Sequence, residues 1–482
     1  MRNFSLFMLV VMLLSGCFKV GPDYRKPQVE TPQTWRFAEQ AAQDTSNLKW
    51  WEQFGDPVLN RLVERGIQRN LDLKIAIANV EQFMGQYGAT RANLFPQIFG
   101  AANYAHAQPS GGGGDVLSSG TNRNEVDFAR LGASMQWEID IWGRLRRANE
   151  AARADLLSSE AVKRGVILSL ASAIAQTYIQ LRTLDKDLEI TREVVRTLKE
   201  DLHIRRVRFQ EGYTSELEVT QAESEYERRN AFIPLYEQSI AQTEHALKVL
   251  LGENPGPIER GRRFDELKIP AVPAGLPSDL LARRPDIAQA EQALIAANAR
   301  IGVAKGLYFP QISLTGDVGQ ISTQVASLFA PGANFWTVGA ALLTPIFTAG
   351  KIAGQVQASE AIQQAALANY QRAIINAFRE FEDTLVGSIK TKQRSIKQAQ
   401  RVTAVENYYH LSRKRYDEGY TDYLTVLDAV RNLFDAQIDL IQARSDNFTA
   451  AIGLYRAMGG GWILAAEKTL QPAKPAEAAI FP

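Results

Sequence analysis

Few residues in this 482-residue chain combine the type and the spacing that chemistry requires. A run of glycines at 111–114 lacks the Gly-Lys-Ser/Thr sequence that a phosphate-binding loop needs, and we interpret it as a surface loop. The single cysteine, Cys17, excludes an intramolecular disulfide framework and any Cys-rich metal site. The histidines are scattered, without the spacing of metal ligands: His106, His203, His245 and His410. We therefore expect no enzyme, no metal site and no bound cofactor.

Cys17 ends a segment that has the pattern of a lipoprotein signal. Arg2 supplies an early positive charge, residues 6–14 form a short apolar core, and Ser15 and Gly16 are small. The core is too short to span a bilayer, so we expect cleavage after Gly16 and acylation of Cys17. An ordinary secretory signal with an incidental cysteine is the alternative. Phe18, rather than aspartate, follows the cysteine, which favours an outer-membrane destination for the lipid anchor.

The net charge of the chain is close to zero, with 54 Lys and Arg against 53 Asp and Glu. A nucleic-acid-binding protein would carry a basic excess, so we expect no nucleic-acid partner. Beyond the N-terminus, no apolar run approaches the ~18 residues that a membrane-spanning helix needs. The composition thus excludes a helical membrane protein.

The sequence contains an internal repeat. Residues 94–98 (Leu-Phe-Pro-Gln-Ile) return at 308–312, and residues 208–214 (Arg-Phe-Gln-Glu-Gly-Tyr-Thr) return at 415–421 as Arg-Tyr-Asp-Glu-Gly-Tyr-Thr. The spacing falls from 214 to 207 residues between the two motifs, as expected if the first copy carries the extra glycine loop. The expected organisation is a signal at 1–16, a lipid-anchored segment at 17–56, a first repeat at 57–254, a linker at 255–277, a second repeat at 278–460 and a tail at 461–482.

Each repeat reads as a helix, two strands, a long helix, a tight turn and a returning helix. Apolar and polar residues alternate strictly over 129–141, which predicts a strand between an apolar and a polar medium. Its length suits a transmembrane β-strand of ~9–11 residues. Residues 311–318 alternate in the same way, and weaker strand patterns lie near 99–104 and 336–346.

Two long helices are predicted at 143–210 and 350–417, since the first contains no proline and one internal glycine. At 1.5 Å per residue, such a helix is roughly 100 Å long. Gly212 and Gly419 allow tight reversals after them, and Thr214 and Thr421 are the expected N-caps of the returning helices. Steps of four and three form a heptad seam along the first helix: Leu170, Ile174, Thr177, Leu181, Leu184, Leu188, Thr191, Val195, Leu198 and Leu202.

Four strands cannot close a membrane barrel, because bacterial barrels begin at about eight. Open strand edges in lipid would leave backbone groups unpaired at a cost of several kcal/mol each. Several copies of the chain must therefore close one barrel together, and the heptad helices need neighbours in the same way. A strand barrel shared between copies and continued by a shared helical barrel meets both needs, so we expect the assembled protein to be a tube.

Several motifs resemble those of TolC-family outer-membrane efflux proteins. They are Gln-Trp-Glu-Ile-Asp-Ile-Trp-Gly-Arg-Leu-Arg-Arg at 136–147, the paired Phe-Pro-Gln-Ile motifs and Arg-Arg-Pro-Asp at 283–286. Cys17, Gly-Pro-Asp-Tyr at 21–24 and the motif at 50–57 are similar to the lipoprotein (NodT) branch. The resemblance implies an α+β membrane fold: a homotrimer in which each chain gives four strands to a 12-stranded outer-membrane β-barrel, continued by a long α-helical coiled-coil barrel in the periplasm.

The resemblance also implies a function and partners. The chain would be the exit duct of a tripartite efflux pump, passing small toxic compounds from an inner-membrane transporter of the resistance-nodulation-division type, through a periplasmic adaptor, to the exterior. It would need no cofactor and would carry a covalent lipid on Cys17. The tip residues Gly212, Tyr213, Thr214, Gly419, Tyr420 and Thr421 would contact the adaptor.

By the same resemblance, Leu424, Asp428 and Arg431 match a periplasmic gate, with an apolar ring, an acidic ring and a basic partner. They share one helical face at i, i+4 and i+7. From spacing alone, a plain Asp428–Arg431 surface pair, worth well under ~1 kcal/mol, is the favoured explanation, and the resemblance shifts the interpretation to the gate. Two other functions stay open: an exit duct of an ATP-driven protein secretion system, and a periplasmic coiled-coil structural lipoprotein.

Overall fold

A computed structural model describes residues 19–30, 36, 49–107, 126–269, 283–463 and 467. The predicted signal, Cys17 and the glycine loop at 111–114 lie outside these residues, as do parts of the predicted linker and tail. The chain divides into two compact units. The first comprises Met1–Gln28, Val80–Ser159 and Ala290–Tyr370, and the second comprises Val29–Asn79, Glu160–Gln289 and Gln371–Pro482.

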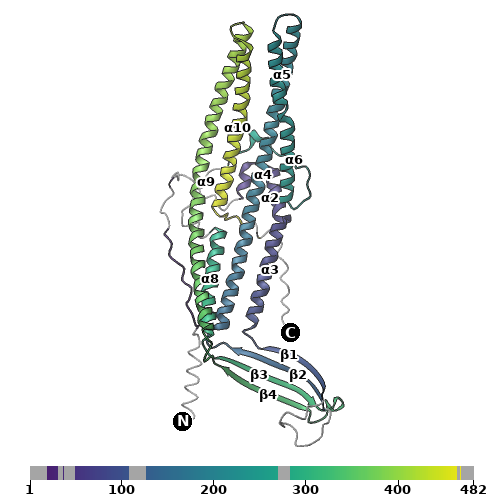
Figure 1. Cartoon of the computed structure of the whole chain (residues 1–482), viewed down its shortest axis with the longest axis vertical. Helices are drawn as coiled ribbons and strands as arrows, with labels where there is room; N and C mark the ends of the chain where they lie inside the picture. Colours follow the sequence, from purple (N-terminus) through teal and green to yellow (C-terminus); the bar gives the residue numbers. More distant parts are fainter. Residues whose placement is uncertain are drawn as a thin grey trace. The chain divides into compact units, whose positions relative to one another are not determined.

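The first unit contains an antiparallel sheet of four strands in the order β1-β2-β3-β4 (Figure 1). The strands are β1 (Gln97–Ala107), β2 (Val126–Ile139), β3 (Gln311–Ser322) and β4 (Asn334–Leu343). All four predicted strands are confirmed, with boundaries that shift by a few residues. The two repeats meet in the middle of the sheet, where β2 pairs with β3.

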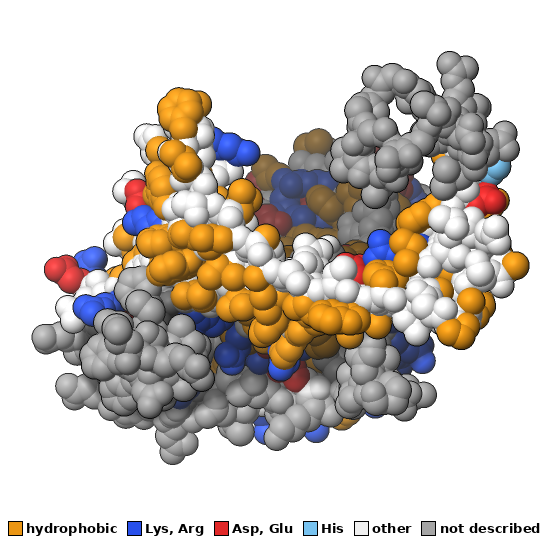
Figure 2. All heavy atoms as spheres, turned by 90° about the horizontal axis from the view of Figure 1, so that it is seen from below, with side chains coloured by type: hydrophobic (Ala, Val, Ile, Leu, Met, Phe, Trp, Pro, Cys, Tyr) orange, Lys and Arg blue, Asp and Glu red, His pale blue; other side chains and the backbone are white. Residues whose placement is uncertain are grey.

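The strand register separates an apolar face from a polar one. Ala133, Val318 and Trp336 are cross-strand partners and lie on one face, because partners in a ladder point to the same side. On the other face, Arg130 donates to the Asp317 carboxylate at 2.8 Å. Figure 2 shows hydrophobic side chains gathered in a band along the sheet. The period-two pattern of the sequence therefore becomes a two-sided sheet.

An extended N-terminal segment, residues 19–26, packs in the same unit against α4 (Arg144–Gln210) and α8 (Pro285–Gly306). The buried guanidinium of Arg147 holds it, donating to the carbonyl oxygen of Gly21 at 3.2 Å and to Asp23 Oδ1 at 2.7 Å. Gly21 has φ +93°, and a Cβ there would come within 2.5 Å of the Gly302 backbone. Only glycine fits this approach, so the segment lies directly against α8, while Arg147 holds it to the start of α4.

The second unit is built on two helical hairpins, whose tips lie at the same end in Figure 1. The long helices α4 and α9 (Lys351–Asp417) have 67 residues each, as the repeat predicts. The chain returns through α5 (Glu216–Asn230) and α6 (Phe232–Leu250) in the first repeat, and through α10 (Tyr423–Ala457) in the second. Only the first return is broken, because Pro234 has no N–H to donate within a continuous helix. No helix among the described residues is long and apolar enough to cross a membrane.

The main core of the second unit lies where the hairpins meet α2 (Pro57–Arg69) and α3 (Leu71–Ala92). Asp56 caps α2 by accepting from Val58 N at 2.8 Å, and Pro57 suits the first helical turn. The described residues also include three short 3-10 helices: η1 (Trp50–Phe54), η2 (Phe264–Glu266) and η3 (Val325–Ser327). The aromatic residues of η1 are buried in this core, and Trp50 stacks on Tyr455 of α10 at 5.8 Å between ring centroids.

Candidate functional site at the helical tips

The two tips have the same backbone geometry. Gly212 and Gly419 both have φ +80°, which confirms the predicted reversals. Tyr213 and Tyr420 follow them and are 82% and 72% exposed. The predicted N-caps were wrong by one residue, because the side chains of Ser215 and Asp422, not of Thr214 and Thr421, accept the first free helix N–H groups. The threonine hydroxyls are thereby free for other bonds.

Beyond the second tip, Leu424, Asp428 and Arg431 lie on one face of α10, as predicted. Leu424 and Asp428 are exposed and Arg431 is half-buried. One oxygen of the Asp428 carboxylate accepts from the hydroxyl of Tyr408 at 3.1 Å and from the side chain of Asn432 at 3.0 Å. An exposed leucine and an exposed carboxylate thus share one face of α10.

Arg431 does not pair with Asp428 among the described residues, so the simple surface pair considered from the sequence is not formed. Its Nε instead donates to Glu225 Oε2 at 2.6 Å. Glu225 belongs to α5, in the first repeat, so this bond joins the two hairpins. Because 206 residues separate the partners, the local spacing of charges could not reveal it.

Glu225 is fully buried and has a second cationic partner. Its Oε1 accepts from Arg229 Nε at 2.9 Å, and Arg229 in turn donates to Asp435 of α10 at 3.2 Å. The Arg229 guanidinium also lies 4.1 Å from the centroid of the Phe434 ring. A buried carboxylate is tolerated only when it is paired in this way, and each arginine pairs with a different oxygen of Glu225, so removing one arginine leaves one oxygen without its short contact.

A second cluster lies closer to the tips and is centred on Arg205, whose side chain is 1% exposed. We call Arg205, Asp201, Tyr416 and Tyr423 the tip cluster. The guanidinium lies between two rings of the second repeat, 4.7 Å from the centroid of Tyr416 and 4.4 Å from that of Tyr423. It donates to Asp201 at 3.1 Å and to the hydroxyl of Tyr416.

Asp201 completes the tip cluster by accepting from the Tyr423 hydroxyl at 2.5 Å. Burial, followed by this hydrogen bond to a carboxylate, raises the pKa of Tyr423 well above its usual value. The tyrosine is therefore a neutral donor at every physiological pH. The cluster joins α4 of the first repeat to α9 and α10 of the second.

The sequence contained a signal for the tip cluster that we did not use. The predicted seam of α4 stops at Leu202, and the next heptad position, three residues on, is Arg205. The structure buries both. An arginine at a seam position must find partners on the facing helices, because an unpaired buried charge is costly. The identity of those partners depends on tertiary packing.

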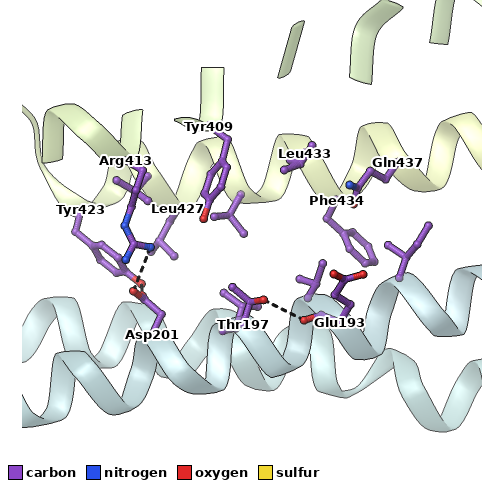
Figure 3. Close-up of a pocket in the computed structure, with 15 residues that line it drawn as sticks. Glu193, Thr197, Asp201, Tyr409, Arg413, Tyr423, Leu427, Leu433, Phe434 and Gln437 are labelled. Atoms are coloured by element: carbon purple, nitrogen blue, oxygen red, sulfur yellow. Dashed lines mark hydrogen bonds and ion pairs between the residues drawn. The ribbon is translucent and has the colours of Figure 1, made fainter. Parts of the chain in front are cut away.

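A cavity of about 330 Å³ lies beside the tip cluster, between α4, α9 and α10 (Figure 3). Its walls are mainly apolar, and Leu427 and Phe434 of α10 contribute to them. Asp201, Arg413 and Tyr423 converge at one end of the cavity. The α10 residues that line the cavity lie on a different helical face from Leu424 and Asp428.

Comparisons with known proteins agree with this architecture. The family described as outer membrane efflux protein matches residues 62–253 and 276–460. A solvent efflux pump outer membrane protein of Pseudomonas putida, SrpC, is 34% identical over 470 residues, covering 96% of this chain and 99% of the relative. A probable outer membrane lipoprotein of Salmonella typhimurium, SilC, is 30% identical, covering 94% and 97%. The Campylobacter jejuni outer membrane channel CmeC superposes with a TM-score of 0.87 at 25% identity, covering 94% of this chain and 99% of that one.

Fold and comparisons together define the class, a TolC-like outer-membrane efflux channel. The chain belongs to the outer membrane efflux protein family, and its role is that of an outer-membrane exit duct for efflux. The resemblance noted in the sequence is thereby confirmed.

Proposed function

We propose that the working duct is a homotrimer with a closed resting gate at the helical tips. The observation that carries the trimer is the open sheet, in which β1 and β4 each pair on one side only among the described residues. Three copies would join β4 of one chain to β1 of the next and give a 12-stranded barrel, within the size range of bacterial barrels. Joining the edges satisfies the backbone groups that lipid would otherwise leave unpaired. The long helices would close a coiled-coil barrel that extends into the periplasm.

The proposed cargo is small toxic compounds, including organic solvents, and the proposed partners are a periplasmic adaptor and an inner-membrane transporter of the resistance-nodulation-division type. The support is the naming of relatives such as the solvent efflux protein SrpC, which is similar over nearly its whole length. No relative reported above is named as a protein-secretion duct. A periplasmic coiled-coil spacer would not account for a sheet with one apolar and one polar face.

The proposed lipid anchor is Cys17, and two features support it. The relative SilC is named a lipoprotein. In this chain, Arg147 holds the segment that follows Cys17 by donating to the carbonyl oxygens of Val20 and Gly21. An anchor joined to a fixed segment would hold the acyl chains in the outer-membrane leaflet beside the start of α4.

The proposed gate consists of Leu424, Asp428 and Arg431. Threefold symmetry would repeat Leu424 and Asp428 as rings, and a ring of carboxylates favours cations. Arg431 would act differently, because its bond to Glu225 holds the second hairpin against the first. The exposed tips at Gly212-Tyr213-Thr214 and Gly419-Tyr420-Thr421 would form the adaptor contact.

Planar-bilayer conductance of the detergent-extracted trimer tests this proposal. Asp428→Ala should raise the single-channel conductance and weaken block by multivalent cations, because it removes the acidic ring. Arg431→Ala should raise the conductance by freeing the second hairpin. Gln221→Ala, at the equivalent place in the first repeat, is the matched control and should behave like the parent protein. Unchanged conductance in both gate variants would reject the gate, and silence from every variant would favour the structural lipoprotein.

A further inference from the structure

The two tips have the same Gly-Tyr-Thr sequence but different hydrogen bonds. In the first tip, Thr214 Oγ1 donates to Glu218 Oε2 at 2.6 Å. The same carboxylate oxygen accepts from the hydroxyl of Tyr416 at 2.7 Å. Tyr416 belongs to α9, so the first tip is bonded, through one carboxylate, to the second repeat.

The second tip has no such link among its described contacts. Thr421 Oγ1 donates to Thr425 Oγ1 at 3.1 Å, and Thr425 bonds to Asp422 at 2.6 Å. All three residues belong to the short segment that runs from the second tip into the first turn of α10. Its threonine therefore stabilises its own helix start and does not reach the first repeat.

The first link continues inward to the tip cluster. The Tyr416 hydroxyl that donates to Glu218 accepts in turn from Arg205, which holds Asp201 and thereby Tyr423. Arg205 Nη1 also lies 3.7 Å from the same oxygen of Glu218, and Arg205 is buried, whereas Glu218 is partly open to solvent. The series thus begins at an exposed turn and ends in the buried contact between the hairpins.

From this asymmetry we infer that Thr214 is a positioning residue for the closed duct and that Thr421 is not. Glu218 sits in the first turn of α5 beside solvent, where a carboxylate has several rotamers to choose from. The Thr214 hydroxyl holds it towards Tyr416. A partner that binds the first tip and takes this hydroxyl for its own contact frees Glu218 from the tip, which weakens its contacts with Tyr416 and Arg205 of the tip cluster. The inference rests on the proposed gated duct and adds which of the two tips is coupled to the contact that keeps it closed.

The test compares Thr214→Val with Thr421→Val, a matched pair that removes one hydroxyl from each tip and keeps the side-chain shape. In planar bilayers, Thr214→Val should occupy the high-conductance state about tenfold more often, since a bond to a charged group is lost. Thr421→Val should match the parent protein, and Thr214→Ser should restore parent behaviour. Tyr416→Phe should resemble Thr214→Val, and the double variant should add little, because both act through Glu218.

Asp428→Ala, measured beside these variants, separates failure of the proposed gate from failure of the inference about Thr214. If Asp428→Ala raises the conductance and Thr214→Val and Thr421→Val remain alike, the inference about the first tip is wrong and the gate stands. If the double variant shows the product of the two single effects, Thr214 and Tyr416 act independently and the link through Glu218 is wrong. If Asp428→Ala is also without effect, the gate fails and the inference fails with it. Elution of each variant as the trimer establishes that it is folded.

Discussion

The bond between Glu225 and Arg431 offers the sharpest test of how the second hairpin is held. Glu225→Gln keeps the shape of the side chain and removes its charge. The carboxylate is fully buried and accepts at 2.9 Å from Arg229 and at 2.6 Å from Arg431. The substitution therefore weakens a contact within the first repeat and the contact between repeats at once.

The size of the effect follows from burial. A hydrogen bond to a charged group contributes about 1.5–3 kcal/mol, and the upper part of that range requires full desolvation. Because Arg431 is 36% exposed, solvent screens its share, and we expect about 1–2 kcal/mol between the hairpins. That loss changes the ratio of closed to open tips by roughly 5- to 30-fold.

The assay is the occupancy of the high-conductance state of the trimer in planar bilayers. Glu223→Gln is the matched control, because Glu223 lies two residues away on α5 and pairs with Arg206 at 2.9 Å while both are half exposed. An exposed pair contributes little, so this control should resemble the parent protein. Glu225→Gln should also lower the melting temperature, since Arg229 loses its buried partner.

A particular pair of results would refute the reasoning. If Glu225→Gln lowers the melting temperature but leaves the open occupancy at the level of Glu223→Gln, the carboxylate stabilises α5 alone. The bond to Arg431 would then have no part in keeping the tip closed. Combining Glu225→Gln with Arg431→Ala gives a second check, because the two changes should be far from additive if they break the same contact.

Two further predictions concern other parts of the chain. Burial raises the pKa of Asp187 to about 7, and one of its carboxylate oxygens has no hydrogen-bond partner among the described residues. Ionisation then costs the folded state stability as the pH rises from about 4 to 7. Asp187→Asn should therefore raise the melting temperature at pH 8, by an amount that shrinks as the pH falls through 7 and disappears below about 4. Asp185→Asn is the comparison and should lower the melting temperature, because it breaks paired contacts to Arg182 and Arg260. If Cys17 is acylated, mass spectrometry of the N-terminal tryptic peptide ending at Lys19 should find a diacylglyceryl thioether and an N-linked acyl chain, and an unmodified cysteine would reject the anchor.

The sequence by itself determined the elements of this protein, because each depends on a local pattern. Period-two alternation over 129–141 predicted β2 from the pleat alone. The absence of proline predicted the 67-residue helices, and the glycines at both tips predicted the reversals. Pro234 was also visible in the sequence, and it accounts for the break between α5 and α6 that we did not predict.

The contacts between elements were decided only by the tertiary structure. The heptad pattern of α4 says that Arg205 faces a neighbouring helix but not that Tyr416 and Tyr423 enclose it. Likewise, the spacing of Asp428 and Arg431 suggested a pair, whereas Arg431 bonds to Glu225 on the other repeat. The physical reason is that helix and strand periodicity depends on neighbours a few residues away. A buried charge, in contrast, takes whichever partner the packing of distant helices brings within reach.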